Sequence, residues 1–74
     1  TDAKTRLQEA LQQTGPVSIV YDTVGEEGPP HAKVFRVQVV VNGSPLAQGL
    51  GASKRSAQQQ AASAALQTLT QTKE

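Results

Sequence analysis

The residues best suited to chemistry follow a glycine-spaced turn at residues 49–52. Ser53 comes first, and its hydroxyl can cap a helix by accepting a hydrogen bond from a first-turn amide. Lys54 and Arg55 come next, in a helical turn whose dipole already supplies about half a positive charge. A bound phosphate would relieve this repulsion, because amides, dipole and cations all favour an anion there. The same residues also fit an ordinary solvated helix start, since exposed Lys and Arg are common.

Catalytic chemistry has much weaker support in this sequence. Hydrolysis of a phosphodiester by two metal ions needs a cluster of carboxylates, whereas the six acidic residues are scattered along the chain. His31 is the single histidine, and no motif places a partner beside it that would make it a general base. Cysteine is absent, which excludes disulfides and Cys-based zinc sites. We therefore expect no catalytic residue, no metal site and no cofactor in this chain.

Length and charge narrow the class of protein further. The chain has 74 residues, which is enough for one small domain, expected to span 1–74 with an ordered core at about 2–69. The net charge is only +1, so binding to nucleic acid would have to come from local clusters of cations. No apolar run reaches the roughly 18 residues of a membrane span, and no signal peptide is visible. We expect a cytoplasmic protein without membrane contact, and we expect both ends to be boundaries within a longer chain.

A first helix is predicted over about Ala3–Gln13, with Asp2 as its N-cap. Its apolar stripe consists of Ala3, Leu7, Ala10 and Leu11. The opposite face carries a row of polar side chains with little charge. These residues are Thr5, Gln8, Glu9 and Gln12. Such a row suits sugar hydroxyls and base edges, although it also fits a plain solvated face.

Three strands and a second helix should follow. Residues 17–24 read as a strand, residues 25–31 as a loop, and residues 33–41 as a strand whose apolar side chains alternate. Asn42-Gly43 predicts a type I′ hairpin turn into an edge strand at residues 44–49. The second helix should cover residues 53–69, with residues 70–74 as a frayed tail. Its inward face should consist of Ala57, Ala61, Ala62, Ala65, Leu66 and Leu69.

The predicted fold class is α+β, in the order α-β-β-β-α. The strands are consecutive and therefore form a three-stranded antiparallel sheet. Only one face of that sheet is apolar, so both helices should pack on that face.

Three separated motifs in this order resemble the double-stranded-RNA-binding domain over essentially the whole chain. They lie at residues 28–35, residues 49–57 and residues 61–66, and the opening residues 2–9 resemble the C-terminal domain of bacterial ribonuclease III. The resemblance implies that this chain binds double-stranded RNA by its shape and does not itself catalyse. It also implies a parent that is a magnesium-dependent endoribonuclease active in RNA and rRNA processing, and homodimeric through its own catalytic domain.

The resemblance also assigns three regions that contact RNA. The first helix would enter one minor groove through Thr5, Gln8, Glu9 and Gln12. The loop would reach the next minor groove through Pro29, Pro30, His31 and Ala32. The second helix would face phosphates across the major groove through Ser53, Lys54, Arg55 and Gln58. A rigid domain of this kind spans about 16 base pairs.

Two positions depart from the family pattern. Many members carry a third cation where Gln58 stands, so one phosphate contact is expected to be weaker or absent. Relatives of ribonuclease III often have an aromatic residue where Ala10 stands, so lighter packing is expected under the first helix.

Two alternatives stay open at this point. The parent could be a non-nuclease RNA-binding protein. The domain could instead be a protein–protein interaction or dimerisation module of the same fold, although the presence of Lys54 and Arg55 argues against that reading.

Overall fold

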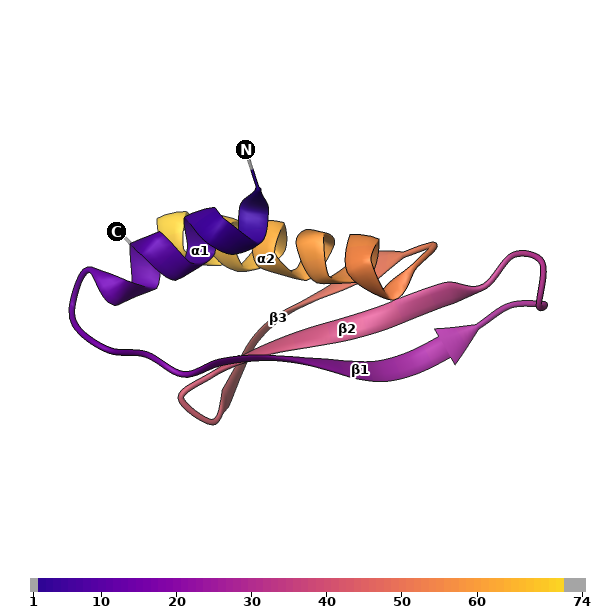
Figure 1. Ribbon diagram of the computed structural model, residues 1–74, viewed down its shortest axis with the longest axis horizontal. Coiled ribbons are helices and arrows are strands. Elements are labelled where there is room, and N and C mark those ends of the chain that lie inside the picture. Colours follow the sequence, from indigo (N-terminus) through magenta and orange to yellow (C-terminus); the bar gives the residue numbers. More distant parts are fainter. Residues whose placement is uncertain (1, 72–74) are drawn as a thin grey trace.

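The computed structural model describes residues 2–71, except for the side chain of residue 71. The chain forms α1 (Ala3–Gln12), β1 (Ile19–Glu27), β2 (Val34–Val41), β3 (Ser44–Gly51) and α2 (Lys54–Gln71). The strands make one antiparallel sheet in the order β1-β2-β3. Figure 1 shows both helices on one side of the sheet, with the β1–β2 hairpin extending beyond the start of α2. The predicted α-β-β-β-α fold is therefore confirmed.

Strand β1 runs further along the chain than the sequence predicts. It begins at Ile19 and continues through Glu27, so the prediction that residues 25–27 belong to the loop is wrong. These residues pair with the start of β2 after the register shifts between Thr23 and Gly25. The shift is a β-bulge, in which one extra residue bends the strand and keeps the pairing going beyond it. Residues 25–27 have the composition of a loop, but their pairing with β2 keeps them in a strand.

The hairpin between β2 and β3 has the predicted type I′ turn. Asn42 and Gly43 have φ angles of 50° and 84°, and both residues of this turn type need positive φ. Strand β3 lies at the edge of the sheet, as Pro45 suggested, and the β2–β3 register shifts where Pro45 pairs with Val40. The strand continues to Gly51, two residues past its predicted end, because these residues still pair with β2.

The core lies between α2, α1 and the centre of the sheet. Its fully buried side chains within residues 2–71 are Leu7, Val37, Val39, Ala57, Ala61, Ala62 and Ala65. Leu66 and Leu69 are partly buried against this cluster, so the predicted inward face of α2 is confirmed. On α1, Leu7 is buried and Ala3 and Leu11 pack against the core, but Ala10 is exposed. The prediction that Ala10 belongs to the buried stripe is wrong, because it lies at the edge of a helix that packs mainly on α2.

Two glycines of β3 allow α2 to lie close to the sheet. A Cβ atom on Gly49 would collide with the backbone nitrogen of Ala61 and would stand 2.8 Å from the Ala57 carbonyl oxygen. A Cβ atom on Gly51 would come within 2.5 Å of the Ala57 amide nitrogen. Both contacts are with helix backbone, so any side chain at these positions would push α2 away. The glycine spacing therefore sets the position of the start of α2 over the sheet.

The start of α1 and the end of α2 differ slightly from the prediction. Asp2 stands at the N-cap position of α1, but its side chain makes no capping bond to the backbone. Its carboxylate instead accepts a hydrogen bond from the Thr5 hydroxyl at 3.1 Å. Helix α2 continues through Thr70 and Gln71, so the predicted fraying is wrong for these two residues, and residues 72–74 lie outside the described part.

Candidate nucleic-acid interface

The start of α2 presents two unpaired cations on a capped helix. The amide of Ser56 donates to the Ser53 hydroxyl at 3.0 Å, and the Ser53 amide donates to the Ser56 hydroxyl at 3.2 Å. This reciprocal pair is a capping box, which confirms Ser53 as the N-cap. Lys54 and Arg55 are exposed, and among residues 2–71 neither forms a salt bridge. Both charges are therefore available to an incoming anion.

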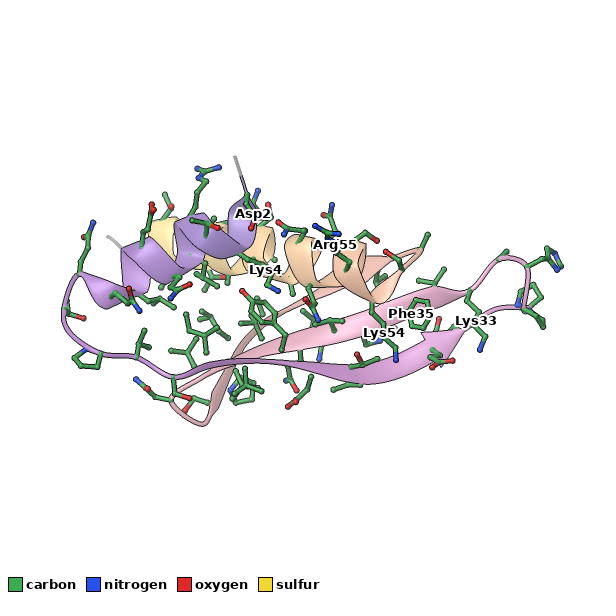
Figure 2. All side chains as sticks on the ribbon, in the orientation of Figure 1. Asp2, Lys4, Lys33, Phe35, Lys54 and Arg55 are labelled. Carbon is green, nitrogen blue, oxygen red and sulfur yellow. The ribbon has the colours of Figure 1, made fainter. Side chains whose placement is uncertain are left out.

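These two cations reach in different directions. Consecutive helical residues do not face each other. In Figure 2, Lys54 points down from the start of α2 over the sheet, whereas Arg55 points away from the sheet. Such an arrangement suits two separate phosphates along a nucleic-acid backbone better than one shared phosphate.

A carboxylate from β1 lies near Lys54. Glu26 accepts a hydrogen bond from Lys33 Nζ at 2.9 Å. This bond and the charge of Lys33, with a smaller effect from Lys54, hold the pKa of Glu26 below its ordinary value. Glu26 therefore stays ionised and offsets part of the positive charge at this end of the candidate interface.

The predicted loop contact lies at the tip of the β1–β2 hairpin. Pro29, Pro30, His31 and Ala32 are all exposed. The turn is closed by a hydrogen bond from the Ala32 amide to the Pro29 carbonyl at 2.9 Å. Gly28 enters it with a φ of 95°, a conformation that L side chains rarely adopt. These constraints give the loop a defined shape, and Figure 1 shows it at the opposite end of the molecule from the C-terminal end of α1.

Two ion pairs hold the strands beneath that loop together. Besides the Lys33–Glu26 pair, Arg36 Nη2 lies 3.2 Å from Glu27 Oε2. Both pairs are exposed, and each of this kind stabilises a fold by only about 0–1 kcal/mol. These ion pairs instead help to fix the shape of the hairpin, because they link the end of β1 to the beginning of β2 across the loop.

The polar row of α1 is exposed as predicted. Thr5, Gln8, Glu9 and Gln12 all lie at the surface. Gln8 and Gln12 also line a hollow of about 220 Å³ between α1 and β1, together with Lys4 and Tyr21. The row is therefore continuous with a polar hollow beside β1.

The sequence analysis does not single out Lys4, whose side chain contacts both α2 and β1. Its Nζ donates a hydrogen bond of 2.8 Å to Gln58 Oε1 on α2, and it lies 4.8 Å from the centre of the Tyr21 ring. Gln58 is partly buried and turned towards α1. In Figure 2, Lys4 points down from α1 into the space between the helices and the sheet. The two residues are 54 positions apart, so no local pattern could have paired them.

The predicted residues of the two helices are brought together, whereas those of the loop stand apart. The Ala3 amide donates to Gln59 Oε1 at 3.0 Å, which fixes the start of α1 on α2. The polar row of α1 and the cations of α2 therefore lie on two helices that pack against each other. The loop residues are carried separately at the hairpin tip (Figure 1).

The side chains of the described residues do not form a site suited to a metal ion. Within residues 2–71, no three His, Asp or Glu side chains lie close enough to share one. The carboxylates of the described residues therefore do not form the cluster that a Mg²⁺ site would need. In the same described region, neither helix is long and apolar enough to cross a membrane.

The capped start of α2 with its two exposed cations, the polar row of α1 and the shaped loop together suit a nucleic-acid-binding domain. The family of the double-stranded RNA binding motif matches residues 3–69, and the chain belongs to this family. The chain is 52% identical over 68 residues to Ribonuclease 3 of Clostridium perfringens. It is 53% identical over 70 residues to Ribonuclease 3 of Streptococcus pyogenes serotype M3. These matches cover 92% and 95% of this chain but only 29% and 30% of the relatives.

Proposed function

We propose that this domain binds double-stranded RNA by shape and positions it for the catalytic domain of a ribonuclease III. Membership of the double-stranded RNA binding motif family supports the ligand class. The likeness to two proteins named Ribonuclease 3 supports the parent. The observation that carries the proposal furthest is the pair of exposed cations, Lys54 and Arg55, on the capped start of α2.

The shape of A-form RNA accounts for why each of the three proposed contact regions would meet a different part of the duplex. Its minor groove is wide and shallow and displays 2′-hydroxyls, whereas its major groove is too deep and narrow for side chains to read. Thr5, Gln8, Glu9 and Gln12 would exchange hydrogen bonds with the hydroxyls of one minor groove. Residues 29–32 would enter the next minor groove. Lys54 and Arg55 would contact the phosphates on either side of the major groove between them.

The parent protein would supply the chemistry that this chain lacks. In our proposal, its catalytic domain is the homodimeric part, holds Mg²⁺ through clustered acids and cuts the RNA in the cytoplasm during rRNA processing. The present domain would raise the local concentration of duplex at that site by tethering. This role requires no group of the present chain to touch the reacting phosphate.

Titrations of the 74-residue chain with matched duplexes test the proposal. An RNA duplex of about 20 base pairs should bind much more tightly than DNA of the same sequence, because only RNA offers 2′-hydroxyls. The variant Lys54→Ala/Arg55→Ala should bind every RNA duplex more weakly, and its salt dependence should be shallower by about two units. Equal affinity for RNA and DNA, or an unchanged salt slope, would contradict the proposal. Self-association without RNA binding would instead favour the interaction module.

A further inference from the structure

Position 58 of α2 lies one helical turn after Lys54 and carries an uncharged residue. Gln58 stands at that position of α2, and its side-chain oxygen accepts a hydrogen bond of 2.8 Å from Lys4 Nζ. The ammonium of Lys4 therefore lies within one hydrogen bond of the residue that lacks a charge. This cation comes from α1, which packs against α2.

The contacts around Lys4 hold its charge in place without neutralising it. Gln58 is an uncharged acceptor, and the ring of Tyr21, 4.8 Å away, attracts a cation only through its quadrupole. Partial burial, with a smaller effect from the charge of Asp2, raises the pKa of the Tyr21 hydroxyl, so the ring stays neutral. Within residues 2–71, Lys4 forms no salt bridge, and the carboxylate of Asp2 accepts from Thr5.

The position of Lys4 also fits an RNA contact. It lines the hollow between α1 and β1 together with Gln8 and Gln12, two of the expected groove-facing residues. Its ammonium thus lies beside the polar row of α1 and contacts α2 through Gln58, one helical turn after Lys54. A lysine normally loses much side-chain entropy when it binds, and the contacts with Gln58 and Tyr21 have already restricted this one.

We propose that Lys4 is the third phosphate-binding cation of this domain and that Gln58 is its positioning residue. The inference rests on the proposed function, since it presumes that duplex RNA is the ligand. It assigns a role in RNA binding to a residue of α1 outside the row of Thr5, Gln8, Glu9 and Gln12. It also accounts for the uncharged residue at position 58, because a cation there would face the ammonium of Lys4.

The test compares salt dependence of duplex RNA binding across a set of variants of the 74-residue chain. Lys4→Gln should weaken binding and make the dependence of log K on log salt concentration shallower by about one unit. The double variant Lys4→Gln/Gln58→Lys should recover the slope, because it exchanges the two residues of this hydrogen bond and so keeps a cation at the same place. Gln58→Leu should weaken binding with little change of slope, because Lys4 keeps its charge but loses its positioning partner.

A matched control removes a charge from the same helix at another place. Arg6 lines a separate hollow against Ser63, Leu66, Gln67 and Thr70 of α2, so Arg6→Gln should leave the slope within error. Thermal unfolding of each free variant separates a loss of binding from a loss of folding. If Lys4→Gln alone proves unstable, the recovery of slope in the folded double variant still tests the exchange of cations.

The outcomes distinguish this inference from the proposed function. A slope that is unchanged in Lys4→Gln and reduced in Lys54→Ala/Arg55→Ala would overturn the role of Lys4 and leave duplex binding intact. Failure of Gln58→Lys to recover the slope in the Lys4→Gln background would likewise overturn it. If the unaltered chain binds RNA and DNA duplexes equally, the proposed function itself fails.

Discussion

Replacing Gly49 with alanine should force α2 away from the sheet. The added Cβ would lie 2.5 Å from the carbonyl carbon of Gln60 and 2.8 Å from the carbonyl oxygen of Ala57, and would collide with the Ala61 nitrogen. Carbon atoms pack best at about 3.5–4.0 Å, so the helix would have to retreat by about 1 Å. Helix backbone cannot rotate out of the way as the end of a long side chain can.

The cost of that retreat should be a large share of the total stability. Overpacking a well-packed core costs about 1–3 kcal/mol, and we expect the upper end here because the atoms in the way are all backbone. A domain of this size has a free energy of unfolding of about 4–11 kcal/mol. Gly49→Ala should therefore remove about 3 kcal/mol. In urea, this loss would lower the unfolding midpoint by about 2 M.

Urea unfolding followed by circular dichroism measures this effect, with Gly25→Ala as the matched control. Gly25 also lies in a strand, but its Cβ would meet the nearest atom, Arg36 Cβ, at an ordinary 3.6 Å. That control should change stability by less than about 1 kcal/mol, and alanine in a strand can even be favourable. Equal midpoints for the two variants would refute the idea that glycine is needed at position 49 for close packing.

Three further predictions concern charge, capping and catalysis. Glu26→Gln should strengthen duplex binding, because it frees Lys33 and removes a negative charge near Lys54; weaker binding would contradict this. Since the folded-state pKa of Glu26 is lowered, its contribution to stability is present above the ordinary Glu pKa and is lost as pH falls, and the variant should lose this part of the acid dependence of unfolding. Ser53→Ala should cost about 1 kcal/mol in denaturant unfolding by removing the cap on the Ser56 amide, and an unchanged midpoint would count against that cap. The isolated chain should not cleave duplex RNA in Mg²⁺, and cleavage by a nuclease-free preparation would overturn this expectation.

The parts of the fold that follow from local rules were predictable from the sequence. Alternating residues in β2, the Asn42-Gly43 turn and the small residues facing the sheet on α2 each follow a short-range pattern, and each is confirmed. The extension of β1 through residues 25–27 follows no such pattern. Those residues have loop composition, and their strand conformation depends on pairing with β2 across a bulge.

The residues of the candidate site could be named from the sequence as candidates, but the contacts among them could not. Family motifs identified Lys54, Arg55 and Gln58, and the capped helix start could be read from Ser53. That Gln58 would meet Lys4 depends on how α1 crosses α2, which is a property of tertiary packing. The charge of Glu26 beside Lys54 depends similarly on the bulge that extends β1.

Because the core is built largely from small side chains, the thermal stability of the domain should depend strongly on whether RNA is bound. Of the seven fully buried side chains within residues 2–71, four are alanine. Unfolding a core with so much alanine exposes less apolar surface than unfolding one of larger side chains, so the heat-capacity change is smaller. A ligand at 100 times its dissociation constant adds about 2.7 kcal/mol to the stability of the folded state. In a domain of this size that gain corresponds to a rise in melting temperature of roughly 10–20 °C. Bound duplex RNA would then set the temperature range over which the domain stays folded.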